Sequence, residues 1–143
     1  MPKSTTFSND LAALIFNATA IANIADNAGS SPLTSLYLSL HTASPGIGGA
    51  QTTNETAYTN YARVAVARSG AGWTVTSGAA VNAALIQFAQ CGVTGATITH
   101  VAIGTASSGG GKVLYAGALS ASLAVANGIQ PQFAASALTA TES

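Results

Sequence analysis

The chain has 143 residues, the usual length of one domain, and 48% of them are hydrophobic. Only 6% are charged, and the four cations and four anions sum to a net charge of zero. Four cations in a chain of zero net charge exclude direct nucleic-acid binding, which needs a positive field and several phosphate contacts. Because a solitary protein usually keeps its net charge away from zero to resist association, we expect a homo-oligomer or a member of a larger assembly.

The N-terminal segment has the pattern of an amphipathic helix. Ser8, Asn9 and Asp10 suit its start, because their side chains accept hydrogen bonds from free N–H groups. Gly29 and the residues up to Pro32 suit its end, so we predict a helix over about residues 8–27. Apolar residues recur at helical spacing, at Leu11, Leu14, Ile15, Ala18, Ile21 and Ala22.

The same segment faintly resembles a secretory signal. It is too polar and too short to span a bilayer, so we expect no membrane partner. Asp10 precedes the apolar run and Met1 is retained, so we expect no cleavage and synthesis in a cytoplasm.

From Thr34 the apolar period changes to two. Leu36, Leu38 and Leu40 alternate with polar residues, which predicts a half-buried strand. The following segment, around Ser44–Tyr58, is rich in Gly, Thr and Asn and lacks apolar periodicity. We therefore predict an exposed loop that contacts a neighbouring subunit, and whose deletion weakens attachment but leaves the domain folded.

Short apolar segments separated by glycine turns fill the rest of the chain. They are YARVAVAR, WTVT, AAVNAALIQF, TITHVAIG, KVLYAG, ALSASLAVA and IQPQFAASALTAT. About seven or eight short strands without βαβ alternation predict a mainly β fold, an antiparallel β-sandwich or jelly roll. We expect one domain over residues 1–143, with the sandwich over about 34–141.

The turn Ser107–Lys112 tests for a phosphate-binding loop. Such a loop needs glycine six residues before the lysine and Ser or Thr after it. Ala106 and Val113 occupy these positions, so the turn is predicted to close a hairpin and to bind no nucleotide.

No residue pattern indicates catalysis, a cofactor or a metal site. No nucleophile elbow occurs, and Cys91 is predicted to be a small buried residue. His41 and His100 are expected to share a sheet face, but no acid lies close in sequence to orient either one. The acids are scattered, at Asp10, Asp26, Glu55 and Glu142. We therefore expect no enzyme.

Three aromatic residues gather near the loop and the strand after it. Tyr58, Tyr61 and Trp73 are open to three interpretations: packing within the fold, anchoring of an interface, or recognition of a carbohydrate.

Four segments in order carry a resemblance to a known family. They are SLYLSLHTASPG, TNETAYTNYARVAVARSGAGW, THVAIGTASSGGGKVLYAGAL and ANGIQPQFAASALTATES. Together they resemble small virion proteins of tailed bacteriophages, which are often labelled tail fibre or minor structural proteins. The resemblance implies a non-enzymatic structural protein of the virion, assembled in the bacterial host cytoplasm beside major capsid or tail proteins.

Within that class, our leading hypothesis is a capsid decoration or cement protein that stabilises the shell. The alternatives are a tail fibre, tail-tip or collar module that contacts the host surface, expected as a trimer, and a carbohydrate-binding module. The contact elements are expected in the helix Leu11–Ile24, the loop Ser44–Tyr58 and the turn Ser107–Lys112. The candidate contact residues are Leu11, Leu14, Ile15, Ile21, Pro45, Ile47, Tyr58, Tyr61, Trp73 and Lys112.

Overall fold

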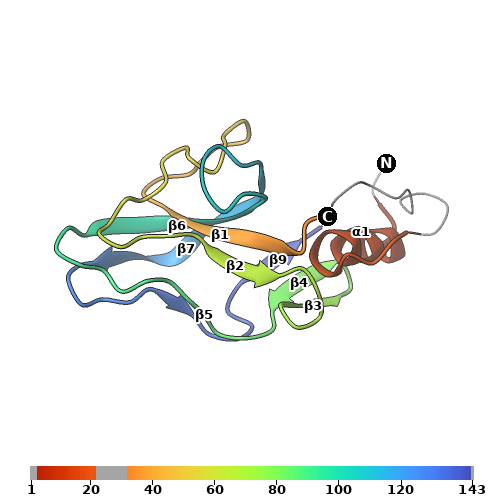
Figure 1. The fold of residues 1–143 in the computed structure, drawn as a ribbon. Coiled ribbons are helices and arrows are strands. Elements are labelled where there is room, and N and C mark those ends of the chain that lie inside the picture. The colour runs from red at the N-terminus through yellow and green to blue at the C-terminus, as the bar shows by residue number, and fades with distance from the viewer. Residues whose placement is uncertain (1–2, 22–31, 143) are drawn as a thin grey trace. The chain divides into compact units, whose positions relative to one another are not determined.

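The computed structural model describes residues 3–21 and 32–142 (Figure 1). It is mainly β with one N-terminal helix, α1 (Thr5–Asn17), as predicted. The strands are β1 (Ser35–His41), β2 (Val64–Ala67), β3 (Trp73–Thr76), β4 (Ala79–Asn82), β5 (Ile86–Gln87), β6 (Ala96–Gly104), β7 (Val113–Val125), β8 (Gln132–Phe133) and β9 (Thr139–Thr141).

The strands form three open antiparallel sheets. Their orders are β2-β1-β6-β7, β3-β4-β9 and β5-β8. The predicted sandwich or jelly roll is therefore not confirmed. Only β1, β6 and β7 among the described strands exceed four residues, so most of the predicted segments are too short to build the two broad sheets of a sandwich.

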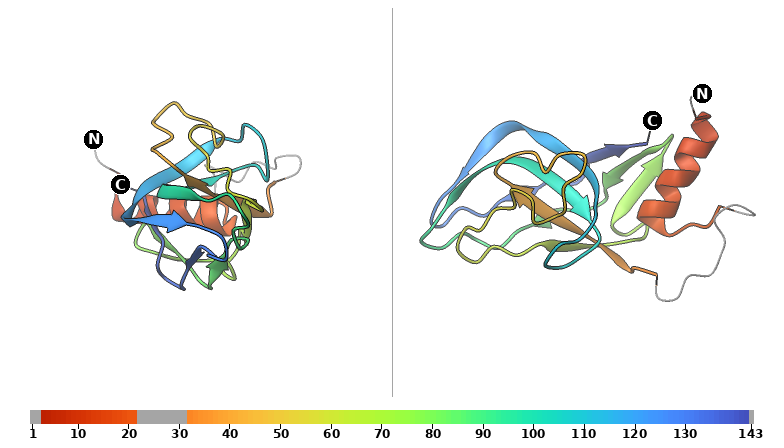
Figure 2. Two further views of the ribbon diagram at one scale, coloured as in Figure 1. Left: turned by 90° about the vertical axis from the view of Figure 1, so that its left-hand side faces the viewer. Right: turned by 90° about the horizontal axis from the view of Figure 1, so that it is seen from above.

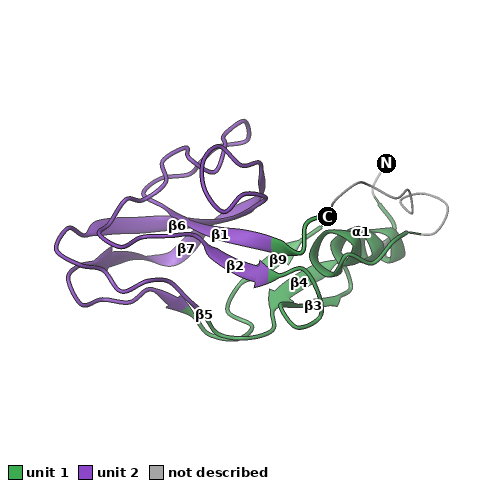
Figure 3. Ribbon diagram, in the orientation of Figure 1, with its two compact units in different colours: residues 1–35, 67–86, 133–143 green, residues 36–66, 87–132 purple. Residues whose placement is uncertain are grey.

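The chain divides into two compact units (Figure 3). Unit 1 comprises residues 1–35, 67–86 and 133–143, and unit 2 comprises residues 36–66 and 87–132. The single domain over residues 1–143 stays a prediction. Unit 1 holds α1 with the three-stranded sheet, and unit 2 holds nearly all of the four-stranded sheet.

Helix α1 begins and ends earlier than predicted. Ser4, not Ser8, caps it, and its hydroxyl accepts a hydrogen bond from the Phe7 amide at 3.2 Å. The helix ends at Asn17, because Ala18 takes a left-handed conformation with φ of 54° and its amide donates to the Ala13 carbonyl. The rest of the predicted helix falls partly on residues 22–31, which lie outside the described residues.

The buried face of α1 also differs from the predicted one. Ser8, Ala12 and Phe16 lie buried at i, i+4 spacing, whereas the predicted face with Leu11 is half-buried. Phe16 meets Trp73 edge to face, with ring centroids 4.7 Å apart. The small side chains at positions 8 and 12 let the helix approach β3 and β4 closely, and the large aromatic ring completes the core of unit 1.

Arg68 fixes the end of the helix within unit 1. Its Nε donates to the Ile15 carbonyl at 2.6 Å and its Nη2 to the Leu14 carbonyl at 2.5 Å. Carbonyls in the last turn of a helix have no partner within the helix and form its negative end. The Arg68 guanidinium supplies hydrogen-bond donors for these carbonyls and a positive charge at the negative end of the helix. The periodicity of the helix itself does not predict this ending.

We expect Arg68→Ala to lower the free energy of unfolding by roughly 1–3 kcal/mol, because hydrogen bonds from a charged group are lost, two to the end of α1 and one to the Leu33 carbonyl. Arg68→Lys is the control, since lysine keeps the charge but cannot reach both carbonyls with one planar group. Denaturant unfolding checks the order wild type, Lys, Ala. Equal stability of all three proteins would show that the helix ends without this residue.

In unit 2, the leucine alternation of β1 is confirmed, but the strand is not half-buried. Leu36, Leu38 and Leu40 are buried on one side, and Ser39 and His41 on the other are 0% exposed. The strand lies between β2 and β6, and the loop that follows it folds back against its polar residues. The alternation of leucine with polar residues does not reveal that a loop also covers the polar face of the strand.

Candidate functional site

Two of the predicted contact elements lie together in unit 2. The loop after β1 and the turn between β6 and β7 meet through a bridge between Ala50 and Lys112. The backbone N–H of Gln51 donates to the Gly111 carbonyl at 2.8 Å. We call residues 44–54 and 105–112 the braced tip. Neither segment indicates the other in the sequence, so their meeting is a finding of the structure.

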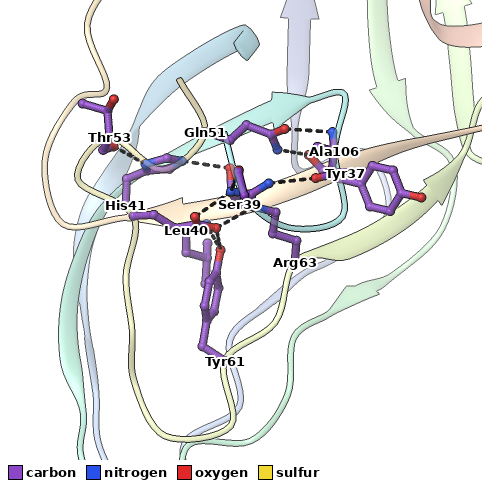
Figure 4. A network of polar contacts seen from close by, with 11 residues as sticks. Tyr37, Ser39, Leu40, His41, Gln51, Thr53, Tyr61, Arg63 and Ala106 are labelled. Atoms are coloured by element: carbon purple, nitrogen blue, oxygen red, sulfur yellow. Dashed lines mark hydrogen bonds and ion pairs between the residues drawn. The ribbon is translucent and has the colours of Figure 1, made fainter. Parts of the chain in front are cut away.

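Gln51 connects three parts of unit 2 from a fully buried position (Figure 4). Its Oε1 accepts a hydrogen bond from the Ala106 amide at 2.9 Å, and its Nε2 donates to the Tyr37 carbonyl at 3.3 Å. A Cβ atom at Gly104 or Gly111 would overlap the Gln51 side chain. These two glycines therefore make room for the amide that holds the turn onto the loop.

Arg63 makes the second connection. Its Nε and Nη2 donate to the two carboxylate oxygens of Glu55, each at 2.7 Å. The same guanidinium donates to the carbonyls of Ala106 at 2.9 Å and Gly109 at 2.7 Å. The Arg63 side chain is 3% exposed and that of Glu55 14%. A bidentate pair this buried is shielded from salt and fixes one geometry of the turn.

The charge of Glu55 is held by these contacts. Burial by itself raises the pKa of this carboxyl, but hydrogen bonds from Arg63 and Tyr61 outweigh it and place the pKa below the ordinary value. The Tyr61 hydroxyl donates to Glu55 at 2.8 Å and accepts from the Leu40 amide at 3.1 Å (Figure 4). The carboxylate is thus fully engaged within the chain.

His41 fastens the base of the tip. Its Nδ1 donates to the Thr53 carbonyl at 3.0 Å, and its Nε2 lies 2.8 Å from the Ser39 hydroxyl, which donates to it. His41 also lies opposite His100 across the β1–β6 pair, which confirms that the two histidines share a sheet face. A serine beside a histidine can act as nucleophile and base, but here both are 0% exposed and no substrate reaches them.

Stability is expected to fall as the pH falls below about 6.5. Burial is the main reason that the pKa of His41 lies below its ordinary value of 6.5. The unfolded chain therefore takes up a proton near that pH while the folded chain resists it, so unfolding is favoured from 6.5 down to the folded-state pKa. Glu55 adds a loss in the same direction, but only below its ordinary value of 4.5.

His41→Gln should remove the first of these losses and keep the second. Denaturant unfolding of both proteins between pH 7.5 and pH 5 measures the difference. A wild-type protein whose stability does not change over this interval, or a variant with the same slope as wild type, would contradict the assignment.

The three candidate aromatic residues are packed within the chain. Tyr58 is 2% exposed and Trp73 is 0% exposed. The Tyr58 hydroxyl donates to the Ala89 carbonyl at 2.9 Å, and burial raises the pKa of Tyr58 to about 12. Tyr61 stacks on Phe88 with ring centroids 6.3 Å apart. Tyr61 is half-buried, whereas Tyr58 and Trp73 offer no exposed ring on which a sugar could stack.

An open hollow of about 440 Å³ lies beside the tip. Its lining includes Glu55, Tyr61, Arg63, Ser107 and Ser108. The polar groups of the first three already bond to partners inside unit 2. The hollow is also lined by Thr56, whose buried hydroxyl has no hydrogen-bond partner among the described residues. Within residues 3–21 and 32–142, no group of three or more His, Cys, Asp or Glu side chains is placed to hold a metal ion.

The other candidate contact residues differ widely in exposure. Ile47 projects from the tip with a relative exposure of 112%, and Lys112 is exposed beside it. Pro45 is buried, as is Ile21 in unit 1. Leu11, Leu14 and Ile15 are half-buried on α1.

The sequence reasoning missed the residues that brace the tip. Gln51, Glu55 and Arg63 stand in ordinary loop and strand contexts. The one available signal was the scarcity of charge, because an arginine and a glutamate in a chain with so few ions are candidates for a buried pair. Nothing in the neighbouring sequence marked Gln51.

In the part of the chain that the structure describes, no helix has the length and apolar character to cross a membrane.

Comparison with known proteins gives one result. Residues 3–141 match the family described as podophage GP4 fiber I protein gp80. The chain belongs to this family of phage fibre proteins, so it is a structural protein of the virion, as the resemblance implied. No curated protein matches the sequence. The family favours the tail-fibre alternative over capsid decoration, for which these findings give no support.

Proposed function

We propose that this podophage fibre protein is a non-enzymatic module of a tail fibre, and that its braced tip contacts the host surface. The observation that carries the proposal is the double connection of the tip by Gln51 and Arg63. Recognition loops are effective when a rigid scaffold holds them, because less conformational entropy is lost on binding.

The side chains exposed on the tip are suited to binding a surface and not to catalysis. Its exposed residues are small, polar, apolar or singly charged, namely Ser44, Gly46, Ile47, Gly48, Thr52, Asn54, the Ser107–Gly110 segment and Lys112. The reactive side chains beneath them are buried or paired. Neighbouring tail proteins are the partners expected at other surfaces, through apolar and main-chain contacts.

Ile47→Asp tests the proposal in intact phage particles. The side chain is fully exposed, so the substitution leaves the fold unchanged, but it places a desolvated charge at the centre of the contact. We expect particles with normal fibre content that adsorb to host cells more slowly. Val93→Asp, at an 86% exposed residue outside the tip, is the matched control and should adsorb normally.

Two outcomes would overturn the host-contact role. Normal adsorption of Ile47→Asp particles would show that the tip does not meet the host. Particles that lack the variant protein altogether would show that the tip attaches the protein to the virion instead.

A further inference from the structure

The hollow beside the braced tip has the size of a ligand site and a fixed shape. Its volume of about 440 Å³ lies within the range of about 300–1,000 Å³ that is usual for small-molecule sites. Residues from the segments 55–63 and 107–109 line it. The turn that carries 107–109 lies beside the loop after β1 (Figure 2). Arg63 bonds to both Glu55 and the Gly109 carbonyl, so the two lining segments are joined before any ligand arrives.

The wall of the hollow contains a buried hydroxyl group that lacks a partner. Thr56 is 3% exposed, and its Oγ1 makes no hydrogen bond to any described residue. Buried polar side chains usually have a hydrogen-bond partner, and an exception in the wall of a hollow points to a group that enters from outside. Ser107 and Ser108 add two exposed hydroxyl groups to the lining.

The charges of the lining favour a ligand without net charge. Glu55 and Arg63 are its only ionised residues among those that the structure describes, and they pair with each other. An anion in the hollow would lie near the Glu55 carboxylate, and a cation would lie near the Arg63 guanidinium. The paired charges therefore attract neither kind of ion, whereas hydroxyl groups can both donate to and accept from a neutral ligand.

Apolar surface lies beside these polar groups. The lining includes the half-buried Tyr61 and the exposed residues Ala57 and Ala62. A tyrosine ring offers an apolar body to C–H groups, and the methyl groups of alanine do the same on a smaller scale. A sugar ring carries both C–H surface and hydroxyl groups, so its chemistry matches the mixed lining of this hollow.

We propose that the hollow binds a neutral saccharide unit of the host surface. A sugar hydroxyl supplies the hydrogen-bond partner that Thr56 lacks, and Ser107 and Ser108 bond to further hydroxyls of the same unit. Arg63 is a positioning residue, because its bonds to both lining segments fix the shape of the hollow. The assignment of the saccharide to the host rests on the proposed host contact of the tip.

Nuclear magnetic resonance titration of the full-length chain gives the first test. Glucose, galactose, mannose and rhamnose are the neutral probes, and glucuronate is the charged one. At least one neutral sugar should shift the backbone amide signals of residues 55–63 and 107–109, and glucuronate should bind more weakly. No shift with any neutral sugar, shifts confined to other residues, or tighter binding of glucuronate would overturn the proposal.

Thr56→Val tests the hydroxyl itself. The substitution keeps the shape of the side chain and breaks no hydrogen bond to a described residue, so the fold is retained. The sugar that binds wild type should bind about threefold to tenfold more weakly, the usual effect of one hydrogen bond. Thr97→Val, exposed on β6 outside the lining, is the matched control and should bind like wild type. Equal binding by the two variants would contradict the role of Thr56.

Ala62→Trp fills the hollow from an exposed position and should abolish sugar binding. Ala65→Trp, exposed on β2 outside the lining, is its control and should bind normally. Binding that survives in Ala62→Trp would place the sugar elsewhere.

Whole particles identify the source of the saccharide. Adsorption of wild-type phage should be inhibited either by polysaccharide purified from the host envelope or by polysaccharide that the host releases, and the inhibiting fraction is the source. Inhibition by neither fraction would overturn the assignment to the host. The two proposals can fail separately. Slow adsorption of Ile47→Asp particles without sugar binding by the chain overturns only the saccharide site, whereas sugar binding with normal adsorption of Ile47→Asp particles overturns the host contact of the tip.

Discussion

Replacing Arg63 with methionine is expected to lower the free energy of unfolding by about 3–5 kcal/mol, because breaking a buried ion pair leaves an uncompensated charge. Glu55 would lose both of its bonds to the guanidinium, and the carbonyls of Ala106 and Gly109 would lose theirs. Denaturant unfolding of the full chain measures the loss. The turn over residues 105–112 should also become more susceptible to proteolysis.

A double variant separates the buried charge from the geometry of the pair. In Arg63→Met with Glu55→Gln, the unpaired carboxylate is gone, so we expect part of the lost stability to return. Arg63→Lys keeps the charge but cannot make the bidentate contact, so the turn should remain loosened. If Arg63→Met unfolds like wild type, the pair does not hold the tip.

Trp73→Ala should lower the free energy of unfolding by about 3–5 kcal/mol, the usual cost of deleting a large buried aromatic side chain. Trp73 is 0% exposed and packs on Phe16, so the substitution opens a cavity between α1 and the sheet of unit 1. Thermal or denaturant unfolding, with helix content followed by circular dichroism, provides the measurement.

Trp73→Phe is the matched control. The Trp73 Nε1 is buried without a hydrogen-bond partner in the described structure, so its removal offsets part of the lost packing. We expect a smaller loss than for alanine. An alanine variant as stable as the phenylalanine variant would place Trp73 outside the core.

Local patterns in the sequence predicted most of the elements. The period of two located β1, and the glycine turns separated the short strands. AAVNAALIQF forms two short strands, β4 and β5. In contrast, KVLYAG and ALSASLAVA form the single strand β7. The glycine between them was read as a break, but Gly117 continues the strand opposite Val101.

Tertiary contacts determine the end of the helix and the burial of the loop after β1, which local sequence patterns did not predict. Helix α1 ends where Arg68, far along the chain, binds its carbonyls. The loop after β1 was predicted to be exposed throughout, yet it buries Gln51, Thr56 and Tyr58. The end of the helix and the burial of the loop both depend on residues distant in sequence. Periodicity and turn signals report only on residues that are close in sequence.

This burial changes one expectation. Deleting residues 44–58 would remove Gln51, Glu55 and Tyr58 together, so it would unfold unit 2 and not merely weaken attachment. Substitutions confined to residues 46–48, such as Ile47→Asp, test the contact without removing these buried side chains.

The number of copies per particle tests the fibre role most directly. Quantitative mass spectrometry of purified virions gives the ratio of this chain to the major capsid protein. The tail-fibre account predicts a small fraction of the capsid protein, because fibres occupy only the tail. A ratio near that of the capsid protein itself would contradict it and point to a protein spread over the whole shell.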